Sequence, residues 1–495
     1  MAGPRDRYLD LVRGASILAV IVGHWLVVDL AWGGDQLRET SALGLVPQMW
    51  PLTWLFQVIP LFFLVAGSAN ARSWRATRRR GDSYSSFVDR RLRRVLVPTG
   101  VYLAVVVPLA VVADAGGGWG LRAGGAMLLQ PLWFLAVYLV VVALTPATLA
   151  WYTRAGWGAP AVLVVVACAA DVGRIGLGWE WAGYLNVLTV WVLVYQLGFL
   201  EADGRISRPG AAVLAVGGLA ATSLLVWLGP YPARMVGVAG DRIANMHPPT
   251  VALTALALAE VGAMVWARRW VEPVLQRERV WHAVVWVNLS IMTLYLWHQV
   301  ALVGAARVAL ASGWPHPPVG TPAWWAARFG LVICAAVVLG LVVLAVGRFE
   351  RVTPPPPTAG GWPAALTTAA SVGLIGLGLL ALAGTRVTEP WAVVDVLAGL
   401  VAGPVVGVAA VASGAWVARS NRLGRPGLGL AGAALCLAAL AVGYRAGLGP
   451  LPRSADAAGL LVALAAVMGL VAGIVGQQRV RNSLRRGRGQ LSAVR

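Results

Sequence analysis

Runs of about 20 apolar residues recur along the chain, and this is the length that a helix needs to cross the hydrocarbon core of a bilayer. The shorter stretches between them hold most of the charged residues. The pattern predicts an all-α, polytopic bundle of about fourteen transmembrane helices. The predicted spans are 9–30, 51–71, 95–113, 126–150, 159–177, 183–200, 211–229, 248–266, 287–311, 328–347, 365–383, 393–418, 427–447 and 458–476.

Composition supports a membrane protein. Of the 495 residues, 59% are hydrophobic and 12% are charged, and the mean hydropathy is +0.73. Soluble domains carry about a quarter charged residues, so this chain has too little charge to cover soluble domains of its length. The three cysteines, Cys168, Cys334 and Cys436, lie inside apolar runs without paired spacing. They indicate neither a disulfide framework nor a metal site.

The distribution of arginine predicts the orientation. The chain contains no lysine, a usage typical of GC-rich bacterial coding, so all 40 basic residues are arginine. With the N-terminus inside, the inner segments hold 29 arginines and the outer segments 7, as the positive-inside rule requires. An even number of spans then places both termini in the cytoplasm. Cytoplasmic loops and anionic lipid, rather than nucleic acid, explain the net charge of +20.

A segment rich in proline and glycine, 353–364, divides the chain into two membrane regions. A run of prolines ends a helix and acts as a stiff spacer. Residues 1–352 contain ten spans with ionisable residues at membrane depth. Basic residues precede the first span and no cleavage site follows it, which predicts an uncleaved signal anchor. Residues 365–495 contain four almost purely aliphatic spans, for which no role is predicted. We expect a multi-pass protein of the inner or plasma membrane.

The first span carries three ionisable residues, Asp10, Arg13 and His24. Arg13 and His24 are eleven positions apart, which places them on one helix face about 16 Å apart along the axis. Near the cytoplasm, Arg13 could hold a phosphate or carboxylate. Deeper in the membrane, His24 could take a proton from a hydroxyl. The alternative is that Arg13 reaches the lipid headgroups and that His24 is a hydrogen-bonded interior residue.

Several motifs resemble the acyltransferase 3 family of membrane proteins over about residues 5–350. The family's mark is an arginine, ten residues and a histidine in the first helix, which Arg13 and His24 match. The second-helix motif departs from many relatives, because Ala66-Gly67-Ser68 stands in place of Ser-Gly-Phe. Further matches follow in the family's order: Pro60–Gly67, Phe87–Pro98, Pro131-Leu-Trp133-Phe134-Leu135, and Asn288-Leu-Ser290 continuing to Tyr295-Leu-Trp297-His298.

The resemblance implies transfer of an acyl group, commonly acetyl from acetyl-CoA, to a hydroxyl of a cell-envelope glycan, a lipid or a secreted small molecule. The donor would be a substrate rather than a tightly bound cofactor. His24 would then act as the catalytic base or as a transient acyl carrier, and Arg13 would engage the acyl-CoA. Four arginines before the third span are candidates for a first contact with CoA phosphates, or simply carry the positive-inside signal: Arg90, Arg91, Arg93 and Arg94.

Other motif residues are candidates for the lining of the site. His298 enters the membrane to a depth similar to that of His24, and it is either catalytic or a structural hydrogen-bond partner. Trp133 either stacks on a ligand or packs in the core. The remaining candidates are Asp10, Ser290 and Tyr295.

Two other classes of function fit the same pattern. Buried charges in many spans are also typical of a transporter or flippase for a lipid-linked or secreted molecule, although no internal repeat is visible. A membrane scaffold fits the last four spans best, because nothing ionisable lies at their centres. The lipid bilayer is the one partner that the pattern requires, and no protein partner is predicted.

Overall fold

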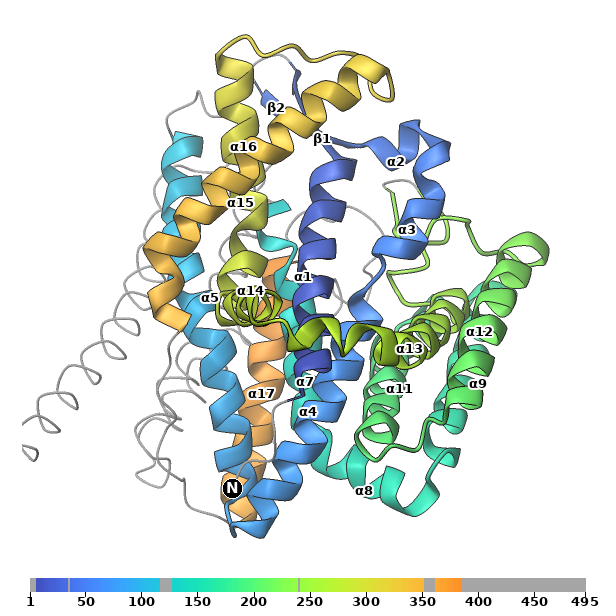
Figure 1. Cartoon of the computed structure of the whole chain (residues 1–495). Coiled ribbons are helices and arrows are strands. Elements are labelled where there is room, and N and C mark those ends of the chain that lie inside the picture. Colours follow the sequence, from blue (N-terminus) through green and yellow to red (C-terminus); the bar gives the residue numbers. More distant parts are fainter. Residues whose placement is uncertain (1–5, 34–35, 116–126, 239–240, 351–360, 384–495) are drawn as a thin grey trace, which may run out of the picture.

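Helices make up most of the protein in the computed structural model, which describes residues 6–33, 36–115, 127–238, 241–350 and 361–383 (Figure 1). The first half contains α1 (Arg7–Val27), β1 (Val28–Gly33), β2 (Gln36–Ser41), α2 (Ala42–Leu45), α3 (Trp50–Phe56), α4 (Ile59–Arg79), α5 (Tyr84–Ala115), α7 (Leu132–Ala143), α8 (Thr145–Ala155), α9 (Gly158–Asp171) and α10 (Glu180–Gly183). The second half contains α11 (Leu185–Ala202), α12 (Arg208–Leu228), α13 (Val251–Val271), α14 (Glu278–Leu289), α15 (Ile291–Ala311), α16 (Pro322–Val346) and α17 (Trp362–Ala383).

The prediction of a helical membrane bundle is confirmed. Eight helical segments among the described residues are long and apolar enough to span a membrane, and the pair α7 and α8, bent by 57°, makes a possible ninth. Each of the first eleven predicted spans lies largely in helical structure, and some of them are divided between two helices. The last three predicted spans lie outside the described residues, so the total of fourteen and the cytoplasmic termini stay predictions.

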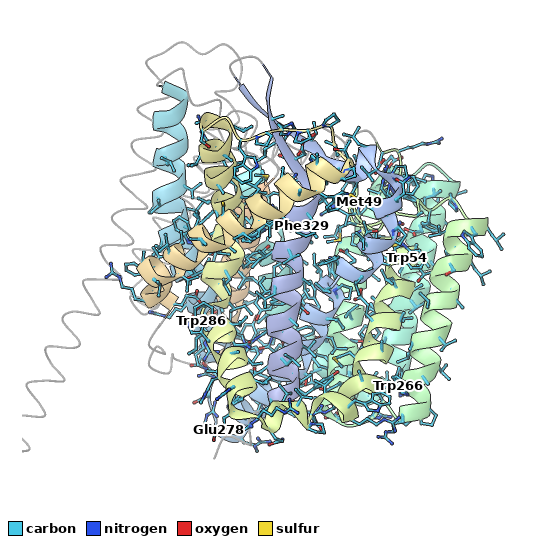
Figure 2. All side chains as sticks on the ribbon, turned by 45° about the horizontal axis from the view of Figure 1, so that its top comes forward. Met49, Trp54, Trp266, Glu278, Trp286 and Phe329 are labelled. Atoms are coloured by element: carbon cyan, nitrogen blue, oxygen red, sulfur yellow. The ribbon has the colours of Figure 1, made fainter. Side chains whose placement is uncertain are left out.

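The outside of the bundle carries many apolar side chains, as lipid contact requires. Figure 2 shows Trp266, Trp286 and Phe329 on this surface, where they are 47%, 51% and 56% exposed. The same figure places Trp54 toward one end of the bundle and Trp266 toward the other. Leu55, next to Trp54 in the chain, is 71% exposed. The apolar surface therefore extends over both halves of the bundle.

A short β-hairpin interrupts the otherwise helical chain directly after α1. Strands β1 and β2 pair antiparallel, with Val28 opposite Ser41 and Gly33 opposite Gln36. The first predicted span, 9–30, is therefore helical only as far as Val27, and its last three residues belong to β1. Strand pairing satisfies backbone groups of β1 and β2.

Two predicted spans are broken where side chains enter the interior. The second span divides into α3 and α4, with Gln57 between them and Pro60 in the first turn of α4. The ninth span begins only at Ile291, because α14 ends at Leu289 and Ser290 separates the two helices. Both breaks position residues of the candidate site described below.

Helix α1 lies in the middle of the bundle and contacts α4, α14 and α15 (Figure 1). Its buried positions recur every three to four residues, as expected for one face of a helix. The Asp6 side chain caps the helix by accepting a hydrogen bond from the Leu9 N–H at 3.1 Å. The buried residues are Tyr8, Leu9, Val12, Gly14, Ser16, Ile17, Ile21 and Trp25.

Glycines allow α4 and α11 to cross at close range. A Cβ atom on Gly67 would overlap the Tyr195 carbonyl, and one on Gly198 would overlap the Leu64 carbonyl. Small residues at such crossings let backbones approach within the membrane. The glycine of the second-helix motif thus has a packing role.

The described part of the predicted C-terminal region packs on the core. Helix α17 contacts α7 and α5, and the Thr368 hydroxyl donates to the Ser85 hydroxyl at 2.9 Å. The division into residues 1–352, 353–364 and 365–495 stays a prediction, because most of the last region lies outside the described residues.

Candidate functional site

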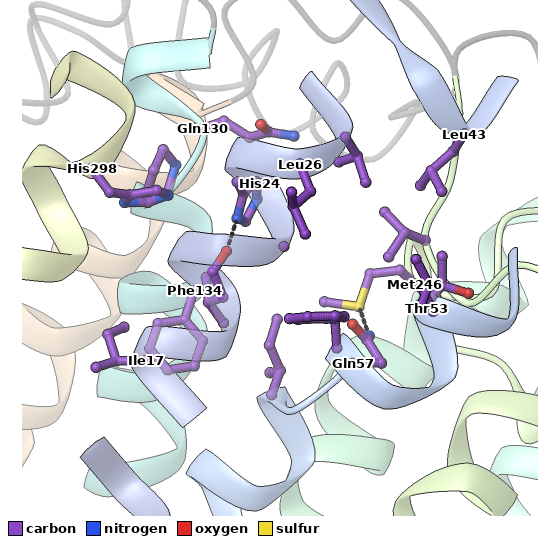
Figure 3. Close-up of a pocket in the computed structure, with 18 of the residues that line it drawn as sticks. Ile17, His24, Leu26, Leu43, Thr53, Gln57, Gln130, Phe134, Met246 and His298 are labelled. Atoms are coloured by element: carbon purple, nitrogen blue, oxygen red, sulfur yellow. Dashed lines mark hydrogen bonds between the residues drawn. The ribbon is translucent and has the colours of Figure 1, made fainter. Parts of the chain in front are cut away.

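A cavity lies beside the C-terminal half of α1. It is partly open, and the space between its walls that no atom occupies, open solvent included, is about 1160 Å³. Its walls come from α1, the α2–α3 segment, the start of α4, residues 130–134, the loop before α13, and α15. Figure 3 shows His24 and His298 close together in this cavity.

The two histidines come from segments far apart in the sequence. His24 stands in the last turn of α1 and His298 in α15, and their ring centroids are 5.2 Å apart. Each donates from Nδ1 to a backbone carbonyl of its own helix, His24 to Val20 at 2.7 Å and His298 to Tyr295 at 2.5 Å. Because a carbonyl can only accept, these bonds place the proton of each neutral ring on Nδ1. Both Nε2 atoms are then left as proton acceptors.

Hydrogen bonds between elements hold this pair in place. The Trp25 indole N–H donates to the His298 carbonyl at 2.9 Å, which fixes α1 against α15. The Tyr295 hydroxyl donates to the Pro131 carbonyl at 2.5 Å, which joins α15 to the segment that precedes α7. The phenol therefore has a positioning role here, and its ring lines the cavity.

Trp133 lines the cavity from α7, as its motif position led us to expect for a site-lining residue. Its ring meets the His247 ring edge to face, with centroids 5.0 Å apart. This contact makes Trp133 part of the wall rather than of the helix packing alone.

Arg13 lies on α1 in a separate polar cluster and is not among the residues that line the cavity. Its Nε donates to the Asn288 side-chain oxygen at 2.6 Å, and its Nη2 lies 3.4 Å from Asp10. Asn288 in turn donates to the Asp10 carbonyl at 2.8 Å. Arg13 and Asp10, three residues apart on α1, therefore form an ion pair. Ser290 is buried at the junction of α14 and α15, two residues beyond Asn288.

The four arginines at the start of α5 do not form one patch. Arg90 donates to the Thr77 hydroxyl at 2.9 Å, and Arg91 donates to the Asn70 side chain and to the Phe87 carbonyl. Arg93 is half-buried, whereas Arg94 is exposed. Two of the four are thus engaged in packing α5 against α4.

His247 is a site residue that sequence reasoning missed. It belongs to the loop between α12 and α13 and lines the cavity opposite Trp133. Burial lowers the pKa of His247 to about 4, so the ring is neutral at physiological pH. In the sequence, His247 is distinguished only by the two prolines that follow it, and this does not predict that it lines a cavity. Gln57, at the break between α3 and α4, was missed for the same reason.

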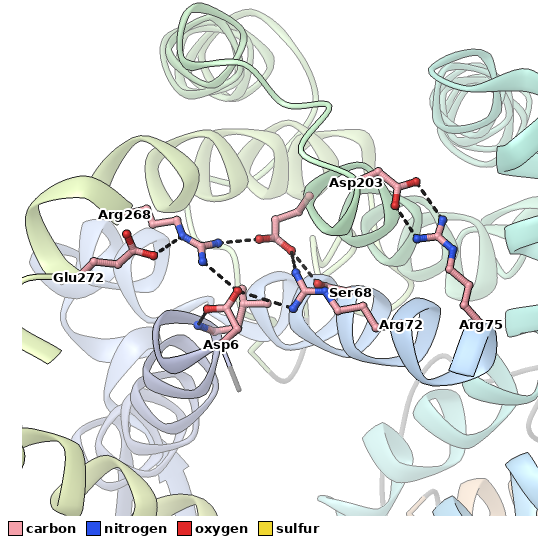
Figure 4. A network of polar contacts seen from close by, with 9 residues as sticks. Asp6, Ser68, Arg72, Arg75, Asp203, Arg268 and Glu272 are labelled. Atoms are coloured by element: carbon pink, nitrogen blue, oxygen red, sulfur yellow. Dashed lines mark hydrogen bonds and ion pairs between the residues drawn. The ribbon is translucent and has the colours of Figure 1, made fainter. Parts of the chain in front are cut away.

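A second polar network closes the other end of the bundle (Figure 4). Arg268 on α13 donates to Asp6 and to Glu201, both at 2.8 Å, and so joins the start of α1 to the end of α11. Arg72 on α4 lies 3.4 Å from Glu201 and 3.6 Å from Asp6. Ser68 on α4 donates to Glu201 at 2.6 Å and so adds a hydrogen bond to the network.

An adjacent ion pair joins α4 to the residue that follows α11. Arg75 binds both carboxylate oxygens of Asp203, with the longer bond at 2.9 Å. Burial alone would raise the pKa of the Asp203 carboxyl, but the hydrogen bond and charge of Arg75 outweigh it and hold that pKa below its usual value. This end of the bundle is therefore crosslinked by charged pairs.

Two charged residues of the fifth predicted span, Asp171 and Arg174, lie away from the cavity. Asp171 accepts hydrogen bonds from Asn186, Tyr231 and the Val251 N–H, while Arg174 lies 3.6 Å from Glu180. Asp171 therefore ties α9 to α11 and to the start of α13, which is a structural role.

Fold and site together define a multi-pass helical membrane protein with a histidine-lined cavity inside the bundle. The chain belongs to the acyltransferase 3 family, since the family model, described as an acyltransferase domain, matches residues 6–343. No curated protein and no solved structure matches the chain. The protein is thus a membrane-embedded acyltransferase, and the match ends within α16, before α17 begins.

Proposed function

We propose that the protein transfers an acyl group, acetyl in the simplest case, from cytoplasmic acyl-CoA to the hydroxyl of a cell-envelope glycan, a lipid or a secreted small molecule. The observation that carries this proposal is the His24–His298 pair in a cavity beside the helix that also bears Arg13. Both termini would lie in the cytoplasm, and the protein would reside in the inner or plasma membrane of a bacterium.

His24 serves as the general base in this proposal. Its Nε2 takes the proton of the acceptor hydroxyl while the oxygen attacks the thioester carbonyl. The new C–O bond forms, the C–S bond breaks, and the proton passes from His24 to the departing CoA thiolate. The Nδ1 bond to Val20 supports this role, because it keeps Nε2 unprotonated before the reaction and orients the ring.

Arg13 holds the charged part of acyl-CoA, which binds as a substrate and leaves as CoA. A guanidinium binds phosphate or carboxylate through two parallel hydrogen bonds. Asp10 and Asn288 orient Arg13 without covering all of it, since its side chain is 34% exposed. The arginines at the start of α5 give the donor a second set of positive charges near the cytoplasm, with the exposed Arg94 the most accessible of them.

The test measures transfer from radiolabelled acetyl-CoA by the full-length protein in lipid nanodiscs, with a panel of hydroxyl acceptors. We expect His24→Ala to lower the rate by about a hundredfold or more. His282→Ala is the matched control, because His282 is an exposed histidine on α14. Full activity of a folded His24→Ala protein would refute the assigned role.

A further inference from the structure

The walls of the cavity differ from those expected for a sugar-binding site. Besides its histidines, most of its lining is aliphatic or aromatic, and no Asp, Glu or Arg is among the described residues that line it. Sugars need hydrogen-bond partners for several hydroxyls, because a buried hydroxyl without a partner weakens binding. The lining is therefore better suited to an apolar ligand.

Most polar side chains in the wall are already engaged with the protein. Gln57 donates to the Met246 sulfur at 2.6 Å, and the Thr53 hydroxyl donates to the Trp50 carbonyl at 2.6 Å. The Tyr295 hydroxyl is bound to the Pro131 carbonyl. These bonds reduce the polar capacity that the cavity offers to a ligand.

One polar atom in the cavity does point to a ligand. His298 is fully buried, and its Nε2 has no hydrogen-bond partner in the described structure. A buried acceptor of this kind is rare unless something binds it. A hydroxyl would satisfy it by donating its one proton, and the His24 ring, with its centroid 5.2 Å away, lies close enough for that proton to be donated to its Nε2 instead.

The neighbourhood of the cavity is also apolar on its outer side. Leu52 lines the cavity and is 39% exposed, while Leu45 and Leu55 on the same connection are 61% and 71% exposed. In a membrane protein, such side chains face lipid tails or the interfacial region. An amphipathic molecule dissolved in the bilayer can approach the cavity along this surface.

Resting on the proposed function, we infer that the acceptor is an amphipathic alcohol, whose hydroxyl binds between His24 and His298 and whose apolar body fills the cavity. The apolar body belongs to the acceptor rather than to the donor, because the anion-binding Arg13 lies about 16 Å away along α1. The acceptor is then a lipid or a hydrophobic secreted molecule, and not a polysaccharide.

The first experiment measures binding without turnover. A diazirine derivative of 1-decanol is photo-crosslinked to full-length His24→Ala protein in nanodiscs, and the modified peptides are mapped by mass spectrometry. We expect labelling of the α2–α3 segment and of the loop before α13, with competition by 1-decanol and none by methyl glucoside. Labelling that methyl glucoside displaces, or that avoids these segments, would overturn the assignment. Because His24→Ala lacks the proposed base, this result is independent of whether acyl transfer occurs.

The second experiment compares donors and acceptors during turnover. We expect 1-decanol to be acetylated from acetyl-CoA and methyl glucoside to be a poor acceptor. Leu52→Gln should raise the KM for 1-decanol about tenfold, whereas Leu344→Gln, at a 77% exposed position on α16 that does not line the cavity, should leave it unchanged. Acetylation of methyl glucoside with equal efficiency would refute the assignment of an amphipathic alcohol as the acceptor, but it would not contradict the proposed acyl transfer. A rate that rises with the acyl chain of the donor, and not with the apolarity of the acceptor, would assign the cavity to the donor instead.

Discussion

The two halves of α1 lie in opposite chemical surroundings. The N-terminal half bears Asp10 and Arg13, and its capping residue Asp6 joins a network of charged pairs with α4, α11 and α13. The C-terminal half borders a largely apolar cavity in which the imidazole of His24 faces that of His298. One helix thus carries a guanidinium at one level and an imidazole at another.

This contrast bears on how one helix can serve two substrates. A phosphate needs fixed positive charge, which is stable where water and counter-charges are near. A neutral imidazole that accepts a proton gains from apolar surroundings, which disfavour its charged form. Separation by about three helical turns keeps the arginine from disturbing the histidines. The following predictions test whether the N-terminal half of α1 acts on the donor alone and the C-terminal half on the acceptor alone.

The largest effect is expected from the second histidine. If His298 Nε2 shares the acceptor hydroxyl with His24, His298→Ala should lower kcat about a hundredfold. His24→Ala combined with His298→Ala should cost little more than the worse single variant, because groups that act as a unit are not additive. Steady-state rates of the three folded variants measure this, and strictly multiplicative losses would separate the two rings in function.

Removal of the charge at Arg13 should affect the donor alone. We expect Arg13→Ala to raise the KM for acyl-CoA about tenfold, with Arg13→Lys intermediate because lysine lacks the bidentate fork. Arg279→Ala, an exposed arginine on α14, is the control. For each variant, we would also measure the rate of acyl transfer at saturating acyl-CoA and the crosslinking of the decanol probe. A changed affinity for the alcohol in Arg13→Ala would break the proposed separation of the two halves.

The sequence predicted where Arg13 and His24 lie on α1, but it did not predict the residues of other elements that contact the helix. Helical periodicity alone placed Arg13 and His24 on one face, and the motifs named Trp133, Tyr295 and His298 as residues that line the site. Spacing within a helix is a local property and can be derived from the sequence. The three motif residues do line the cavity, and their roles in a functional site stay predictions. The pairing of Arg13 with Asn288, by contrast, joins residues 275 positions apart, and no local pattern encodes such a contact.

Three other features escaped prediction for physical reasons that differ. The hairpin after α1 depends on backbone pairing, which a hydropathy pattern does not detect. His247 comes to the cavity through a loop without periodicity. The arginines at the start of α5 look like one cluster in sequence, but helical geometry turns Arg91 toward Asn70 and leaves Arg94 exposed. A charge cluster along the chain is therefore a weak guide to a binding surface.

The charged network at the start of α1 should influence stability more than catalysis. Glu201 and Glu272 both pair with Arg268, but their side chains are 6% and 47% exposed. Glu201→Ala leaves Arg268, Arg72 and Ser68 without that partner and should destabilise the fold by about 2 kcal/mol. Glu272→Ala should change stability by less than about 0.5 kcal/mol. Thermal unfolding in the same detergent measures both, and equal shifts would show that burial does not set the strength of this network.

The smallest expected effect concerns His247 and pH. Burial lowers its pKa from 6.5 to about 4, so between these values the unfolded chain binds more protons at this site than the folded protein does. Stability from this group is therefore complete above about pH 6.5 and is lost as the pH falls toward 4. We expect the unfolding temperature to decline across this window and His247→Gln to flatten the decline, whereas His282→Gln on the exposed face of α14 should not. The decline in this pH window comes from the cavity end of the molecule. The ion pair of Asp203 with Arg75, at the other end, loses its contribution to stability only at lower pH, because the pKa of the Asp203 carboxyl lies below its usual value. A His247→Gln protein with an unchanged pH profile would show that the loop before α13 opens enough to hydrate the imidazole, and the cavity wall opposite Trp133 would then be a movable one.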